Sequence, residues 1–236
     1  MADRPRARDE MHTTADNGLT SGWLASAGLQ EAVLSVFDLD RVAVALGDVG
    51  GYRRLVLPDV DRGRSSQAGW PAGCTRIEQS LLVPPGSHAA AMGCLRLLRF
   101  HGLPQRVMRS SQRSWDTGGL FDVDVYARDV DAVYRGLQRH GWTAFGEPVE
   151  YREAEFHVRQ VVAVGPDGLV LAIIQRYSPP VPALDDPALG MTPIFNSTQM
   201  VRDFERSARF YEAALGWQKT HDFLIDAAAE PGADVL

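Results

Sequence analysis

The stretch VRDFERSARFYEAALGW (residues 201–217) decides the fold. Asp203 stands where its side chain can cap the free N–H groups at the start of a helix. Apolar residues then recur at helical spacing, at Phe204, Ala208, Tyr211 and Leu215. Gly216 suits the left-handed residue that closes a helix. Because the run before Asp203 resembles a strand, we expect a β-strand, a capped helix and a glycine turn.

Two earlier stretches repeat this pattern. In residues 31–52, Asp38 precedes the helical run and Gly51 follows it. In residues 122–142, Asp129 and Gly141 hold the same positions. A repeat of this kind reveals the building block of a fold, and the block here is a strand followed by an N-capped helix.

Further strand-like runs follow the helices. They lie near residues 52–58, 76–83 and 92–100 in the first repeat, and near 143–149, 155–164 and 169–175 in the second. The sequence Gly-Pro-Asp-Gly at 165–168 fits a type I turn between two of them. A further short strand is expected near residues 219–225. The elements predict an α+β fold.

The motifs Phe210-Tyr211 and Leu215-Gly216-Trp217, with the turn at 165–168, resemble those of the βαβββ modules of the vicinal oxygen chelate superfamily. This superfamily includes glyoxalase I, bleomycin-resistance proteins and extradiol dioxygenases. The resemblance covers most of residues 28–236. It implies tandem βαβββ modules that pair into a cupped mixed sheet with helices outside. It does not fix an activity, because such folds host many chemistries.

Four parts can be separated along the chain. Charged residues with no hydrophobic region predict a disordered tail at 1–27. Residues 28–178 hold two modules, 28–106 and 119–177, which we expect to pair. Prolines predict a linker at 179–190. Residues 191–236 hold a third module that lacks its last strands.

Composition excludes several classes of function. The net charge of −6 offers no electrostatic case for binding nucleic acid. No apolar run approaches the roughly 20 residues that span a bilayer. Cys74 and Cys94 have no CxxC spacing and suit reduced thiols, so we expect a cytoplasmic protein.

The resemblance implies where a divalent metal would bind, on the first and last strands of each module. The first-strand position holds Glu31, Asp122 and Asn196 in the three modules. The last-strand position holds Ala172 in the second module and lies near Leu97 in the first. Two apolar residues stand where carboxylates are needed, so we expect no essential metal. The alternative is a hard divalent cation held by Glu31 and Asp122.

Other polar residues are candidates for binding a ligand. His157 and Arg159 share one face of their strand because strand side chains alternate, and together they suit an anionic or phenolic ligand. The same residues could equally form the solvent face of the sheet. The predicted ligand-binding residues are Glu31, Asp122, Asp124, His157 and Arg159.

The leading expectation is a protein that binds a small organic molecule in the cup, similar to the bleomycin-resistance proteins. The alternative is a metal-dependent lyase, isomerase or dioxygenase that acts on an oxygenated substrate. A third class is a scaffold whose modules mediate assembly. We also expect a homodimer formed through the third module, because its helix is rich in apolar residues and its strand at 196–201 has an unpaired edge.

Overall fold

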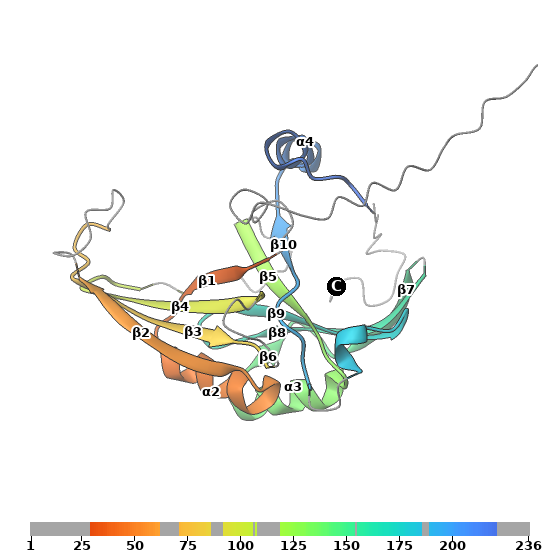
Figure 1. Ribbon diagram of the computed structural model, residues 1–236, viewed down its shortest axis with the longest axis horizontal. Helices are drawn as coiled ribbons and strands as arrows, with labels where there is room; N and C mark the ends of the chain where they lie inside the picture. Colours follow the sequence, from red (N-terminus) through yellow and green to blue (C-terminus); the bar gives the residue numbers. More distant parts are fainter. Residues whose placement is uncertain are drawn as a thin grey trace, which may run out of the picture.

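The computed structural model describes residues 29–61, 71–85, 92–105, 107, 119–153, 155–185 and 189–220. Within these residues the chain forms two mixed β-sheets, and two helices lie side by side on the same side of both sheets (Figure 1). The α+β class and the helices outside the sheets are as predicted. The tail predicted at residues 1–27 lies outside the described residues.

The first module builds the four-stranded sheet. It consists of β1 (Glu31–Ser35), α2 (Leu39–Gly50), β2 (Arg53–Asp61), β3 (Arg76–Val83) and β4 (Cys94–His101). The strand order is β1-β4-β3-β2, with β1 parallel to β4 and the other pairs antiparallel. Asp38 caps α2 by accepting from the backbone N–H of Asp40 at 2.8 Å, and Gly51 ends the helix with a φ of 72°. Both roles are as predicted.

The second module repeats this order. It consists of β5 (Gly119–Tyr126), α3 (Val130–Arg139), β6 (Thr143–Ala144), β7 (Val149–Glu153), β8 (Phe156–Val164) and β9 (Val170–Ser178). Strand β5 is parallel to β9, and β8 pairs antiparallel with β9. The predicted turn is present, because the Gly168 N–H donates to the Gly165 carbonyl at 3.0 Å. Asp129 caps α3 through the N–H of Ala132 at 2.9 Å.

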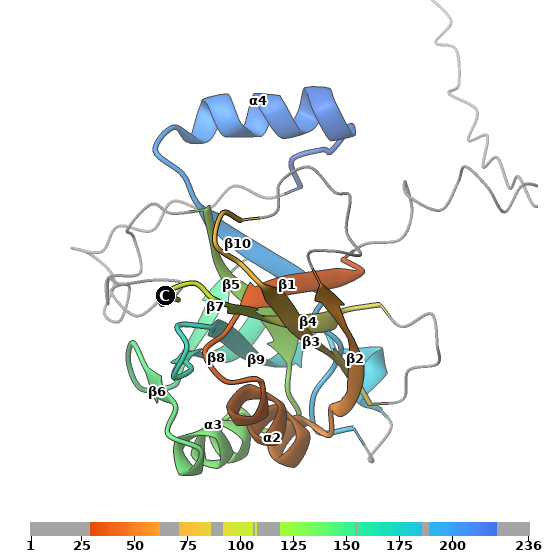
Figure 2. The same ribbon diagram turned by 90° about the vertical axis from the view of Figure 1, so that its left-hand side faces the viewer.

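The third module adds a strand to the sheet of the second. After the short 3-10 helix η1 (Pro182–Leu184), β10 (Asn196–Met200) pairs antiparallel with β5 and is followed by α4 (Phe204–Leu215). The sequence predicts an unpaired strand edge at 196–201. This prediction is wrong for one edge of β10, which pairs with β5. No residue of α4 is buried, and the helix lies apart from α2 and α3 (Figure 2). Lys219 and Thr220 form no strand, and the rest of the strand predicted at 219–225 lies outside the described residues.

The first and second modules meet through their helices. A Cβ atom on Gly136 of α3 would come within 2.8 Å of the Val49 side chain of α2, so glycine permits this close approach. The two modules are also tied at the start of α2, where the Phe37 N–H donates to Asp167 at 3.1 Å. Buried side chains from both modules form one continuous core.

Residues 191–195, just beyond the predicted linker, lie between the two modules. Met191 and Ile194 are buried in the shared core. The Tyr52 hydroxyl donates to the Thr192 carbonyl at 3.0 Å, and the Ile194 N–H donates to the Gly93 carbonyl at 3.2 Å. The segment that carries β10 is therefore anchored in the core of the first two modules.

Candidate functional site

Two buried carboxylates lie at the contact between β5 and β10. Asp122 and Asp124 of β5 are each 5% exposed. Asn196 of β10 donates from Nδ2 to Asp124 Oδ2 at 2.8 Å, and the Thr198 N–H donates to Asp122 Oδ1 at 3.1 Å. Strand β5 has one extra residue here, Phe121, and bulges of this kind are common next to functional sites because they re-aim side chains.

Burial keeps one of these acids neutral. Burial first, and then the charge and hydrogen bond of Asp122, raise the pKa of Asp124 to about 8, against the lowering effect of the Asn196 amide. Among the described residues, Asp124 Oδ1 has no hydrogen-bond partner. At neutral pH this side chain is therefore a carboxylic acid that can donate a hydrogen bond.

An aromatic and cationic group surrounds Tyr126, which lies two residues beyond Asp124 on β5. The Tyr126 ring stacks on Phe195 with 4.1 Å between ring centroids, and the Arg176 guanidinium lies over Tyr126 at 4.8 Å. Arg176 also donates to the Tyr126 hydroxyl at 3.1 Å and to the Pro180 carbonyl at 3.2 Å. Its Nε is buried without a partner, and no described carboxylate forms an ion pair with it.

These residues share the face of the sheet that points away from α3, which we call the inner face. Asp124 lies opposite Ala172 in the β5–β9 register, whereas Leu171 and Ile173 on either side of Ala172 belong to the core on the helix side. Because strand side chains alternate, Asp124, Tyr126, Ala172 and Arg176 lie on the inner face.

The contact between β5 and β10 has a local two-fold symmetry. Asp122 and Asn196 each lie seven residues before the aspartate that caps their helix, and Asp124 and Thr198 each lie five before it. In the sheet Asp122 pairs with Thr198, and Asp124 pairs with Asn196. Asp122 thus lies opposite the residue equivalent to Asp124, and Asp124 lies opposite the residue equivalent to Asp122. The site is therefore built from two modules.

Glu31 lies in the other sheet, at the position equivalent to Asp122. Arg96 of β4 donates two hydrogen bonds to its carboxylate, one of them at 2.9 Å, and donates to Gln79 at 3.0 Å. The carboxylate is therefore already neutralised by a cation. The hydrogen bonds and ion pairs of the described residues do not bring Glu31 and Asp122 together.

The strand register also corrects one equivalence drawn from the sequence. Ala172 lies opposite Asp124, and the residue of the first module opposite the equivalent Val33 is Arg96. Leu97 is one residue further and is buried in the core on the helix side. A shift of one residue moves a side chain to the other face of the sheet, so the first module has an arginine at this position.

His157 and Arg159 lie on the opposite face from the two aspartates. Arg159 donates to both oxygens of Asp131 in α3, at 3.0 and 3.2 Å, which places it on the helix side. His157 lies 2.7 Å from a Glu150 carboxylate oxygen and packs against the Tyr177 ring. The two residues share a face, as alternation predicts, but their predicted contact with a ligand remains untested.

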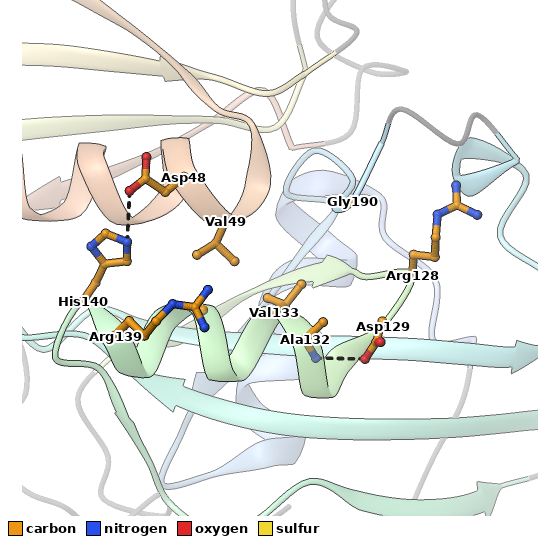
Figure 3. A pocket seen from close by; sticks show the side chains of 10 residues that line it. Asp48, Val49, Arg128, Asp129, Ala132, Val133, Arg139, His140 and Gly190 are labelled. Carbon is orange, nitrogen blue, oxygen red and sulfur yellow. Dashed lines mark hydrogen bonds and ion pairs between the residues drawn. The ribbon is translucent and has the colours of Figure 1, made fainter.

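A pocket of about 380 Å³ lies between α2 and α3, on the helix side. It is lined by charged residues that form contacts of their own, and Figure 3 shows those of Asp48 with His140 and of Asp129 with the Ala132 N–H. His140 Nε2 lies 3.2 Å from Asp48 Oδ2, Arg139 donates to the Arg135 carbonyl, and Arg128 donates to the Leu184 carbonyl. The pocket therefore offers a ligand fewer uncommitted polar atoms than the inner face does.

The residues that sequence reasoning missed are Tyr126, Phe195 and Arg176. Alternation could have identified two of them, because Tyr126 is two residues beyond Asp124 and Arg176 is four beyond Ala172. Nothing local marks Phe195, whose place depends on the pairing of β10 with β5. Within the described residues, no group of three His, Cys, Asp or Glu side chains is arranged to hold a metal ion.

Solved structures share this architecture. Glyoxalase I from maize (Zea mays) is 21% identical, with a TM-score of 0.52 over 80% of this chain and 55% of its own. A candidate dioxygenase from Bacillus subtilis is 11% identical, with a TM-score of 0.52 over 84% of this chain and 57% of its own. The chain thus spans little more than half the length of either protein. No protein-family model and no curated protein sequence matches it. These likenesses show that the chain shares the glyoxalase-like fold.

Proposed function

We propose that the protein binds a small organic molecule on the inner face of the six-stranded sheet, without an essential metal ion. The observation that carries the proposal is the buried, neutral Asp124 beside Asp122, on the same face as the partly unpartnered Arg176. Burying two acids costs stability, and perturbed groups of this kind cluster at functional sites.

The polar groups indicate the chemistry of the ligand. Protonated Asp124 can donate to an oxygen acceptor, and Arg176 can bind an anionic group. Tyr126, which contacts Arg176, is two residues along the strand from Asp124, or roughly 7 Å. A small oxygenated organic acid, such as a hydroxylated aromatic carboxylate, matches this spacing.

The donor set does not suit a tightly bound metal ion. Ala172 has no ligand atom, and Asn196 and Thr198 direct hydrogen-bond donors at the two carboxylates. Glu31 is held by Arg96 in the other sheet. These contacts support a binding mode that uses hydrogen bonds and Arg176, and they argue against the proposed cation at Glu31 and Asp122.

The second candidate is an enzyme of the same superfamily, a lyase, isomerase or dioxygenase acting on an oxygenated substrate. The raised pKa of Asp124 favours it, because a carboxylic acid that titrates near neutral pH is suited to general acid catalysis. In that case Asp124 is the acid, and Arg176 and Asn196 position the substrate.

The remaining parts of the proposal concern the setting. We place the protein in the cytoplasm, because the buried Cys74 and Cys94 are in no disulfide bond. The partners proposed are the small ligand and a second copy of the chain, with no nucleic acid. No helix of the described residues is long and apolar enough to cross a membrane.

Calorimetry with benzoate, 4-hydroxybenzoate and catechol tests the proposed site. Replacing Arg176 by Gln removes a charge-assisted hydrogen bond worth about 1.5–3 kcal/mol, so affinity for the two acids should fall roughly 10- to 150-fold. Asp124→Asn should weaken binding of all three compounds. Arg139→Gln in the helix-side pocket and Arg159→Ala should change little. Loss of affinity in Arg139→Gln alone would move the site to that pocket.

Elemental analysis separates the two candidate functions. The proposal predicts no stoichiometric transition metal. About one Fe, Mn, Ni or Zn per chain that disappears in Asp122→Ala would establish the metal-dependent alternative instead.

A further inference from the structure

Three strands place one residue each in a row across the inner face. Tyr126 of β5 lies opposite Ile174 of β9, and Ile174 lies opposite Gln160 of β8. Val161 and Ala163 of β8 belong to the core on the helix side, so alternation places Gln160 on the inner face. The backbones at Tyr126 and Gln160 are two strand spacings apart, or roughly 10 Å. The row therefore has a fixed length across the sheet.

The three residues of this row are more accessible than the row beside them. Each of the three is half-buried. Asp124 and Ala172, in the row on one side, are buried. Arg176 and Tyr151, which both border Val158 in the row on the other side, are half-buried. A ligand on the inner face therefore lies over the middle row, with Asp124 at its margin.

One end of the row carries the cation of the proposed site. The Arg176 guanidinium lies 4.8 Å from the centroid of the Tyr126 ring and 5.8 Å from that of the Phe156 ring. Contacts with two aromatic rings hold the guanidinium in place through cation–π attraction. Its Nε has no hydrogen-bond partner among the described residues. The acid group of a ligand can therefore bind at this end.

The other end of the row carries an amide whose orientation is fixed. Tyr151 of β7 donates its hydroxyl hydrogen to Gln160 Oε1 at 2.9 Å. This bond engages the amide oxygen and leaves the Nε2 group, which can only donate, for another contact. Among the described residues, no hydrogen bond joins Gln160 Nε2 to a neighbour. The end of the row opposite Arg176 therefore presents a hydrogen-bond donor.

We propose that Gln160 determines which ligand is selected, by donating to an acceptor oxygen at the end of the ligand opposite the acid group that Arg176 holds. This inference rests on the proposed function, because it requires an acid bound at Arg176. The ligand is then an aromatic acid that carries a carbonyl-type oxygen across the ring from the acid, and the ring lies over Ile174. Tyr151 is a positioning residue, because it acts on the ligand through Gln160.

The polar groups around the row are all donors, which supports this class of ligand. Arg176 and Gln160 Nε2 donate, and the protonated Asp124 beside the row donates as well. A ligand with an amino group opposite its acid would place a donor against the Gln160 donor. An unmatched donor of this kind costs affinity, so the site should prefer a carbonyl to an amine at that position.

Calorimetry with benzoate, 4-acetylbenzoate and 4-aminobenzoate tests the proposal on the full chain. The wild type should bind 4-acetylbenzoate roughly 2- to 13-fold more tightly than benzoate, which is the gain expected of one neutral hydrogen bond. In Gln160→Leu this ratio of affinities should fall to about one. Gln160→Glu replaces the donor by an acceptor of the same shape, so its preference should change from 4-acetylbenzoate to 4-aminobenzoate.

Two further variants test the positioning role and the location. Tyr151→Phe should lower the ratio of 4-acetylbenzoate to benzoate affinity, because the amide is then free to turn. Gln138→Leu is the matched control, since Gln138 is an exposed glutamine of α3 on the helix side, and it should keep the full ratio. Gln160→Glu also covers the case in which Gln160→Leu does not fold.

The outcomes distinguish this inference from the proposed function. If benzoate binds through Arg176 but the acetyl group adds no affinity, or if both Gln160 variants keep the wild-type preference, the inference is wrong and the proposed function stands. An equal loss of the ratio in Gln138→Leu would also overturn the inference. If none of the acids binds, or if their binding does not change in Arg176→Gln, the proposed function and the inference are both wrong.

Discussion

Glu31 and Asp122 hold the same position in two copies of one module, but the protein treats them differently. Glu31 is about 29% exposed at its side chain and is neutralised by Arg96. Asp122 is 5% exposed and lies beside a second acid, Asp124, whose pKa is raised to about 8. Glu31 is neutralised by a cation, whereas Asp124 is neutralised by a proton.

The difference follows from the neighbouring strands. In the first module, Arg96 stands on β4 opposite Val33, within reach of Glu31. In the second module, Ala172 stands at the equivalent position of β9, and β10 covers the acids instead. The first arrangement resembles a structural ion pair. The second leaves a protonated acid on a face where a ligand can bind, and its energetic cost is consistent with a function.

The largest expected effect comes from loosening the segment that carries β10. Met191 is fully buried between the first two modules, so Met191→Ala should destabilise the protein by about 2–5 kcal/mol in urea unfolding. Met92→Ala is the matched control, since Met92 is 38% exposed, and it should change stability by less than about 0.5 kcal/mol. Equal effects of the two variants would show that residues 191–195 do not anchor β10.

The repeat explains how much of this could be predicted from the sequence. Asp38, Asp129 and Asp203 identify three helix starts, and the turn at 165–168 identifies a hairpin, because caps and turns depend on neighbours along the chain. The pairing of β10 with β5 joins residues more than 70 positions apart, and no local signal specifies it.

The site was predicted in part for the same reason. Asp122 and Asp124 could be found by counting back from Asp129, which is a local operation. The face of a strand on which a side chain lies is more difficult to predict, because an error of one residue reverses it. The sequence predicts Leu97 at the position where the structure has Arg96. The sequence correctly predicts that Arg159 lies on a strand, but its partner Asp131 comes from a helix whose side of the sheet the sequence does not specify.

The next effect depends on pH, and it tests whether Asp124 is neutralised by a proton, in contrast to Glu31, which is neutralised by Arg96. The pKa of Asp124 is about 8 in the folded protein and about 3.9 when unfolded. The folded state therefore binds more protons between these values, so wild-type stability should fall as pH rises from about 4 to 8. Asp124→Asn should not lose stability in this way. Its free energy of unfolding relative to that of the wild type should therefore rise by on the order of a few kcal/mol between pH 5 and pH 9.

Thermal unfolding of both proteins at pH 5, 7 and 9 measures this gain. Asp185→Asn is the control, because Asp185 is exposed, and its difference from wild type should be the same at each pH. If the difference in stability between Asp124→Asn and the wild type did not change with pH, it would contradict the claim that Asp124 is neutral in the folded protein.

The smallest effect is expected at Glu31. Arg96→Gln breaks a half-exposed ion pair and should cost about 1 kcal/mol or less, with a smaller loss at high salt. Arg209→Gln, which breaks the highly exposed pair with Glu205, provides the lower limit and should cost almost nothing. If Arg96→Gln lost as much stability as is expected for Met191→Ala, the ion pair of Glu31 would not be the solvent-accessible one that the account requires.

The central claim is that the contact between β5 and β10 holds a neutral carboxylic acid at neutral pH. Carbon-13 NMR of aspartate carboxyl groups, followed from pH 3 to 10, observes it directly. One aspartate signal should titrate near pH 8 and should be absent in Asp124→Asn. A spectrum in which every aspartate signal titrates below about pH 5, near the ordinary value, would contradict the account.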